Sequence, residues 1–217
     1  MALMFDVSKT LVHKAIHEMW LLLHQAFRSM ITWLSAEEWE SMKGELEELE
    51  EAVGTSHRIH RPTEKQALFY SGHRHIHCIH TQVIIDTGKK IRYIKSGFLG
   101  HNNDVMTYRL MDAIGPHEIL SFLRDCYLLG DTIYPSEHPI TTPYTARQLR
   151  NQNAVIRDQS KFVNEKIRAR RVFVKHSIRR MKIYKIIGSL YRHCRNDIAP
   201  IVELCSPFSL RRNLLHD

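Results

Sequence analysis

Alternating side chains between His73 and Lys95 constrain the fold of this chain more than any other feature. The segments HRHIHCIHTQVII and IRYIKSGFLG flank a DTGK sequence at Asp86–Lys89, whose aspartate and glycine are typical of a turn. Alternation with a period of two predicts strands, because successive side chains on a strand point to opposite faces. We therefore predict a β-hairpin in this part of the chain.

Helical patterns precede the hairpin. Residues 5–34 place apolar side chains at steps of three to five residues, with Ser8 as a candidate N-cap. The start of this segment, FDVSKTLVHKAI, resembles the second half of a helix-turn-helix unit, and packing in a core or a dimer is the alternative. Ser35 and Glu38 form a capping-box pattern, which predicts a second short helix that continues into a run of glutamates.

Strand and helix patterns also alternate after the hairpin, which predicts an α/β domain. The sequence Asn102-Asn103-Asp104 is expected to open a helix of roughly a dozen residues. The remaining expectations are a helix at 119–123, a short buried strand at 127–131, a proline-containing loop at 134–143, a helix from Ala146, and a long basic helix or helix pair at 158–191.

Charge is unevenly distributed along the chain, which carries 31 Lys and Arg against 23 Asp and Glu and a net charge of +8. Residues 37–51 hold eight glutamates and one lysine, a net charge of −7. Residues 161–195 hold twelve Lys and Arg against Glu165, a net charge of +11. Two solvated helix faces would explain this pattern, and a helix that binds the phosphates of nucleic acid is the alternative.

Composition also bears on compartment and on metal binding. No apolar segment reaches the ~18 residues of a membrane helix, so we expect a soluble intracellular protein. The four cysteines are far apart, which favours reduced thiols over disulfides. Alternation would place His73, His75 and His77 on one strand face, where a zinc site needs a further ligand from a neighbouring strand. Polar residues on an outer face are the simpler interpretation.

A series of motifs follows in fixed order: YSGH at 70–73, GFLGHNND at 97–104, LGDTIYP at 129–135, and a closing helix at 168–182. Over roughly residues 50–200, this series resembles the DDE superfamily 4 endonucleases, which include Harbinger-type transposases and nucleases derived from them. It is also similar to bacterial insertion-sequence transposases. The resemblance implies an α/β, RNase H-like mixed sheet flanked by helices.

With that resemblance, we divide the chain into three parts. Residues 1–48 form an N-terminal helical segment that resembles a truncated helix-turn-helix, residues 49–205 form the DDE endonuclease-type domain, and residues 206–217 form a C-terminal tail.

The family implies three carboxylates: an aspartate in a strand motif similar to DGT, the aspartate of GDxxY, and a glutamate on the late helix. Together they would hold two Mg²⁺ or Mn²⁺ ions about 4 Å apart for DNA phosphodiester cleavage. Asp131 matches the second carboxylate and is the metal ligand retained here. Val53 and Lys175 stand where the other two catalytic carboxylates are expected. We therefore expect impaired catalysis and doubtful metal binding.

Other carboxylates are weak substitutes. Glu51 shares a strand face with Val53 but lies about 7 Å away along the strand. Glu165 points roughly 80° aside from Lys175 and lies nearly three helical turns away. Asp104 is expected to cap the next helix, with support of the metal ligands as the alternative. Lys175 would either form an ion pair with Asp131 or point to solvent.

Three functional hypotheses follow. The first is a transposase-derived protein that has lost nuclease activity, and the second is a working endonuclease in which Glu51 or another carboxylate compensates. The third is a non-enzymatic protein that binds nucleic acid or another partner through residues 161–195. We expect DNA as a partner, homo-oligomers, no membrane or small-molecule substrate, and a nuclear location if the source is eukaryotic. The expected DNA-binding residues are Arg168, Arg170, Arg171, Arg179, Arg180 and Lys182.

Overall fold

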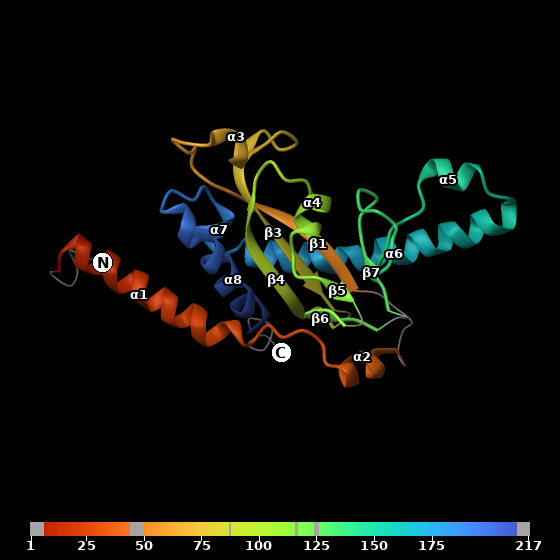
Figure 1. Cartoon of the computed structure of the whole chain (residues 1–217), viewed down its shortest axis with the longest axis horizontal. Coiled ribbons are helices and arrows are strands. Elements are labelled where there is room, and N and C mark those ends of the chain that lie inside the picture. The colour runs from red at the N-terminus through yellow and green to blue at the C-terminus, as the bar shows by residue number, and fades with distance from the viewer. Residues whose placement is uncertain (1–6, 44–49, 87, 116, 124–125, 212–217) are drawn as a thin grey trace.

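A mixed sheet forms the centre of the computed structural model, which describes residues 7–43, 50–86, 88–115, 117–123 and 126–211 (Figure 1). The strand order is β2-β3-β1-β7-β8. Strand β4 also pairs with β3, on the edge that faces away from β1. Strands β1, β3 and β4 are antiparallel neighbours, whereas β7 runs parallel to β1 and β8 parallel to β7. The strands are β1 (Glu50–Arg58), β2 (Tyr70–Ser71), β3 (Ile76–Ile85), β4 (Ile91–Leu99), β7 (Leu128–Leu129) and β8 (Ile140–Thr141).

The predicted hairpin is confirmed as β3 and β4, and β3 is buried from Cys78 to Ile85 because helices and loops cover both faces of the sheet. The strand begins at Ile76, later than predicted. His73 and His75 lie in the preceding turn, with His75 at φ +53°. The prediction that His73, His75 and His77 share one strand face is therefore wrong, because the first two are not in a strand.

One face of the sheet is covered by three helices near the C-terminus. They are α6 (Ala154–Met181), α7 (Lys185–Gly188) and α8 (Arg195–Arg211). Their apolar side chains pack on the sheet in one core cluster with Val83 and Ile85, to which α6 contributes Val174 and Met181. The basic segment predicted as a long helix or helix pair is therefore a long helix followed by a short one. Helix α8 continues across the expected start of the C-terminal tail at residue 206.

Helix α1 (Lys9–Arg28) packs against α8, where the rings of Phe27 and Phe208 lie 4.7 Å apart (Figure 1). The Ser8 hydroxyl accepts a hydrogen bond from the Leu11 amide, which confirms the predicted N-cap. The helix ends at Arg28, six residues before the predicted end. Much of the predicted apolar stripe is exposed: Leu11, Ile16, Met19 and Met30.

The opposite face of the sheet is covered by α2 (Ala36–Lys43), α4 (Asp104–Arg109) and a pair of short parallel strands, β5 (Ile114–Gly115) and β6 (Leu120–Ser121). A second core cluster joins these elements to the sheet; it includes Trp39, Ile84, Phe122, Leu128 and Tyr134. The predicted capping box is confirmed at the start of α2. Glu38 accepts from the Ser35 amide, and the Ser35 hydroxyl accepts from the Glu38 amide.

Two predictions on this side of the sheet are wrong. Helix α4 has six residues instead of about a dozen, and its N-cap is Asn103, whose side chain accepts a hydrogen bond from the Met106 amide. Asp104 is therefore the first residue of the helix, not its cap. The helix predicted at 119–123 is replaced by strand β6, because pairing with β5 outweighs the weak local preference of five apolar-rich residues.

The glutamate run does not continue as a helix where the structure describes it. Glu50 and Glu51 begin β1, and residues 44–49 lie outside the described part of the chain. The loop predicted at 134–143 contains strand β8. Two further short helices complete the fold, α3 (Gln66–Phe69) and α5 (Ala146–Arg150). Among the described residues, no helix is long and apolar enough to span a bilayer.

His57 on β1 makes the stability of this fold dependent on pH. Its side chain is 1% exposed, and burial lowers its pKa to about 4, with a smaller contribution from the Lys182 ammonium. Unfolded His57 takes up a proton below about pH 6.5, whereas folded His57 stays neutral until about pH 4. Acidification through this window therefore favours the unfolded state.

We predict that His57 accounts for a loss of about 2 kcal/mol in the free energy of unfolding between pH 7 and pH 5. Urea unfolding at both pH values should show a smaller loss for His57→Gln than for the parent protein. His60→Gln is the matched control because His60 is exposed, and it should keep the full pH dependence. Equal pH dependence in all three proteins would contradict this role of His57.

Candidate functional site

The backbone segments that carry Val53, Asp131 and Lys175 meet at one end of the central strands. Strand β1 pairs in parallel with β7, with Glu51 opposite Leu129. Continuing this register by two residues places position 53 level with Asp131. Helix α6, which carries Lys175, packs across β1. The side chains of Glu51 and Val53 lie outside the described part of the structure.

The Asp131 carboxylate is held by an arginine of helix α6. Its Oδ2 atom lies 2.9 Å from a guanidinium nitrogen of Arg171. Its Oδ1 atom accepts hydrogen bonds from the backbone amide and the hydroxyl of Thr132, at 2.7 and 3.3 Å. Both carboxylate oxygens are therefore engaged by protein donors, and the side chain is directed toward α6.

Lys175 lies one helical turn after Arg171 and is exposed. Among the described residues it has no ion-pair partner, so the interpretation that it points to solvent is confirmed. The alternative ion pair between Lys175 and Asp131 is wrong, because Arg171 occupies that position. The neighbouring Val174 is 2% exposed and faces the core.

Asp104 approaches β1 at Gly54. A side chain at position 54 would collide with the Asp104 carboxylate, so this close approach requires a glycine. Gly54 pairs with Gln82 of β3. Ile84, two residues further along β3, points to the same face of the sheet as Gln82 and belongs to the core cluster on the α4 side. Gly54 therefore faces the α4 side. Asp131, by contrast, is held by α6 on the other side. The two carboxylates therefore approach the sheet from opposite faces.

Tyr134 lies beside this cluster and is 4% exposed. Burial raises the pKa of its hydroxyl, and the charges of Asp104 and Asp131 raise it further. Contacts with the Gln82 side chain and the Gly54 backbone act in the opposite direction and lower this pKa. The hydroxyl is therefore located between β1 and β3.

Among the described residues, the donor set at this site does not fit a pair of divalent cations. Asp131 is paired with a cation, and valine and lysine stand at the other two positions. No group of three or more His, Cys, Asp or Glu residues among those described is arranged to hold a metal ion. Asp104 cannot complete a shared set with Asp131 because it approaches from the other face of the sheet.

Basic residues form a stripe along one side of α6 that passes Asp131. From each basic residue of the stripe to the next, the steps along the helix are seven, three, four, four and three residues. These steps keep the side chains on one side of a helix. This cationic stripe consists of Lys161, Arg168, Arg171, Lys175, Arg179 and Lys182. Arg170 and Arg180, which were also expected to bind DNA, lie off the stripe by helix geometry. Lys182 is the C-cap of α6, and burial lowers the pKa of its ammonium.

A cavity of about 440 Å³ opens beside Asp131, between α6 and the loop that leads into α5. Sequence reasoning missed it because the loop and the helix are far apart in the chain. Its lining consists of Thr132, Pro143, Tyr144, Thr145, Ala146, Asn164, Arg168 and Arg171.

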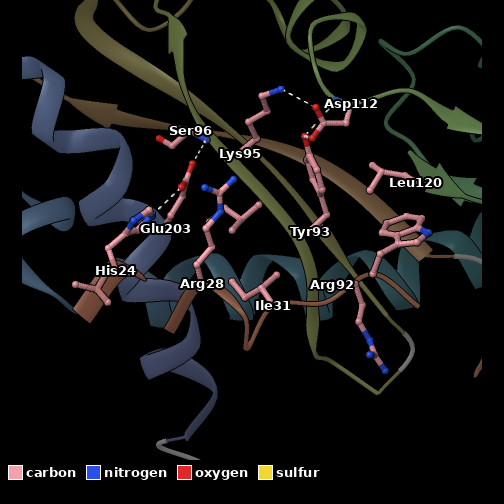
Figure 2. Close-up of a pocket in the computed structure, with 13 residues that line it drawn as sticks. His24, Arg28, Ile31, Arg92, Tyr93, Lys95, Ser96, Asp112, Leu120 and Glu203 are labelled. Carbon is pink, nitrogen blue, oxygen red and sulfur yellow. Dashed lines mark hydrogen bonds and ion pairs between the residues drawn. The ribbon is translucent and has the colours of Figure 1, made fainter. Parts of the chain in front are cut away.

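A second cavity, of about 400 Å³, lies at β4 on the other side of the sheet's central strands (Figure 2). Figure 2 shows two ion pairs among the charged groups that line it. Glu203 lies 3.0 Å from His24, and Lys95 lies 2.9 Å from Asp112, which also accepts a hydrogen bond from the Tyr93 hydroxyl. These contacts tie α1, α8 and β4 together, so this cavity is a structural junction.

The fold and the site together define a mixed α/β domain of nuclease type. Residues 52–207 match the family model described as DDE superfamily endonuclease, and this match covers more than half of the chain. The chain belongs to that family. Neither the curated proteins nor the solved structures include a match.

Gly54 offers a direct test of the Asp104 contact. We predict that Gly54→Ala lowers the free energy of unfolding by about 1 kcal/mol, because the added methyl group displaces the Asp104 carboxylate, which lies at the free end of a side chain and can move aside. Gly72→Ala is the matched control, since nothing lies within 4 Å of the added atom, and it should change stability by less than about 0.5 kcal/mol. Urea unfolding measures both changes, and equal effects would refute the close approach.

Proposed function

We propose that this protein is derived from a DDE transposase, binds DNA, and has lost metal-dependent phosphodiester cleavage. The ion pair between Asp131 and Arg171 is the observation that supports this proposal most directly. Arginine stays protonated at all relevant pH values, so it competes permanently with a divalent cation for the retained carboxylate. Lys175 adds positive charge one turn away, which further opposes cation binding.

The proposed fold is RNase H-like, with a mixed sheet flanked by helices. The antiparallel meander β1-β3-β4, extended on the other side of β1 by the parallel strands β7 and β8, supports it. We retain the division at residues 48 and 205 as part of the proposal, with α1 as part of a helix-turn-helix-like segment. Homo-oligomers, and a nuclear location in a eukaryotic source, also belong to it.

DNA binding is assigned to the cationic stripe of α6. Lys and Arg side chains at successive turns of one helix side can follow a phosphate backbone and displace its condensed counterions. This role does not depend on catalysis, so it agrees equally with a protein recruited as a non-enzymatic DNA-binding module. The alternative of a working endonuclease depends on a compensating carboxylate such as Glu51.

Adjacent arginines near the end of α6 test the stripe. We predict that Arg179→Glu lowers affinity for duplex DNA about tenfold at low salt and flattens the dependence of affinity on salt. Arg180→Glu is the matched control, because it makes the same change of charge at the next residue, which lies off the stripe. It should lower affinity for duplex DNA less than about threefold. Fluorescence anisotropy titrations over a series of salt concentrations measure both. Equal losses would show that net charge alone, without the stripe, governs binding.

Loss of cleavage is tested with supercoiled plasmid and millimolar Mg²⁺ or Mn²⁺. We predict the same background nicking for the parent protein and for Asp131→Asn, because the carboxylate is already neutralised by Arg171. Agarose gels separate nicked from supercoiled plasmid. Cleavage by the parent protein that Asp131→Asn abolishes would refute the proposal and favour a compensating carboxylate.

A further inference from the structure

The cavity beside Asp131 combines guanidinium groups with an aromatic ring, a pairing that suits a nucleotide. We propose that this cavity binds one nucleotide of single-stranded DNA without a metal ion, its phosphate on Arg168 and Arg171 and its base against Tyr144. The inference rests on the proposed DNA binding and goes beyond it by naming a site and a form of DNA.

The charge of the cavity favours a phosphate. Arg171 and Asp131 form a neutral pair, whereas Arg168 makes no ion pair with another described residue. The two arginines are three residues apart on α6, so their side chains are neighbours on the helix surface. The unpaired charge of Arg168 gives the cavity a net positive charge. Planar guanidinium groups also match pairs of phosphate oxygens, so a phosphate can be contacted directly there.

The aromatic side of the cavity is held in place before any ligand binds. The Asn164 side chain accepts a hydrogen bond from the Tyr144 amide and donates one to the Tyr144 carbonyl, at 2.8 and 2.9 Å. The next residue, Thr145, forms a capping box with Gln148 that fixes the start of α5. Tyr144 is thus fastened to α6 at Asn164, one helical turn before Arg168, although it remains 40% exposed.

Size and chemistry together point to an unpaired base. A cavity of about 440 Å³ lies in the usual range for small-ligand sites, enough for one nucleotide. Stacking on a tyrosine needs an exposed face of the base, which a paired and stacked duplex does not offer. The carboxylate of Asp131 contributes by orienting Arg171, so the residue that the family uses for a metal would here position a phosphate ligand.

Short fluorescent oligothymidylate in the presence of EDTA is the probe for this site, with anisotropy as the readout. Tyr144→Leu should lower affinity for the single strand about fivefold or more, because a stacking surface is lost. Tyr70→Leu is the matched control, since Tyr70 is also 40% exposed but lies on β2, and it should change affinity less than twofold. Thermal unfolding establishes that both variants are folded.

Arg168→Gln and Arg179→Gln test the phosphate contact, because both residues are exposed and belong to the same stripe. The first variant should lose clearly more affinity for the single strand, whereas the two should lose similar affinity for duplex DNA. Thymidine 5′-monophosphate serves as competitor. Displacement that Arg168→Gln abolishes shows that a free nucleotide also enters the site, and absence of displacement assigns the site to nucleotides within a strand.

Two results separate this inference from the proposed function. If duplex binding persists while Tyr144→Leu matches Tyr70→Leu and Arg168→Gln matches Arg179→Gln, the nucleotide site is refuted and DNA binding stands. If the parent protein binds neither single-stranded nor duplex DNA, the proposed function itself is refuted. Single-strand binding that requires Mg²⁺ would also overturn the inference, since the site is proposed to act without a metal.

Discussion

The pairing of strand β1 along both of its edges is the constraint on which the rest of the structure depends. Its antiparallel ladder with β3 runs from Glu51 to Arg58, and its parallel contact with β7 brings a segment from far along the chain to its other side. That parallel contact places Asp131 level with position 53. Because α6 packs across the same strand, the segments that carry position 53, Asp131 and Lys175 share one end of the sheet.

The charge at this end of the sheet is balanced within the protein. A cluster of carboxylates is costly without a cation, because like charges repel at short range. Position 53 carries no charge in this chain, and Arg171 neutralises the carboxylate of Asp131. The ion pair is partly exposed, so its contribution to stability is modest, and its main effect is to fix the direction of Asp131. The charge of the Asp131 carboxylate is thus balanced by a cation of the protein itself.

Local signals in the sequence predicted the elements whose formation is local. The hairpin, the Ser8 cap and the Ser35–Glu38 capping box each depend on residues close together in the chain, and all are confirmed. Strand β6 was mistaken for a helix because its structure depends on pairing with β5. The partner of Asp131 was missed for a similar reason. Lys175 was considered through the family motif, whereas contact with Arg171, one turn earlier, depends on how α6 docks on the sheet.

The distribution of charge over the two faces of the sheet bears on function more than the net charge of the chain does. The acidic residues of α2 and the basic residues of α6 lie on opposite faces of the sheet, and α2 uses its own charge locally, since Glu38 contacts Arg92 of β4 at 3.0 Å. Arg92 also contacts Asp86 at 2.7 Å, which closes this network around the hairpin. The described acidic residues of α2 are therefore in no position to neutralise the cationic stripe. Two members of the stripe, Lys161 and Arg171, pair with Asp158 and Asp131, and the exposed Lys and Arg that remain, beside a cavity with an aromatic wall, support the proposed polyanionic partner.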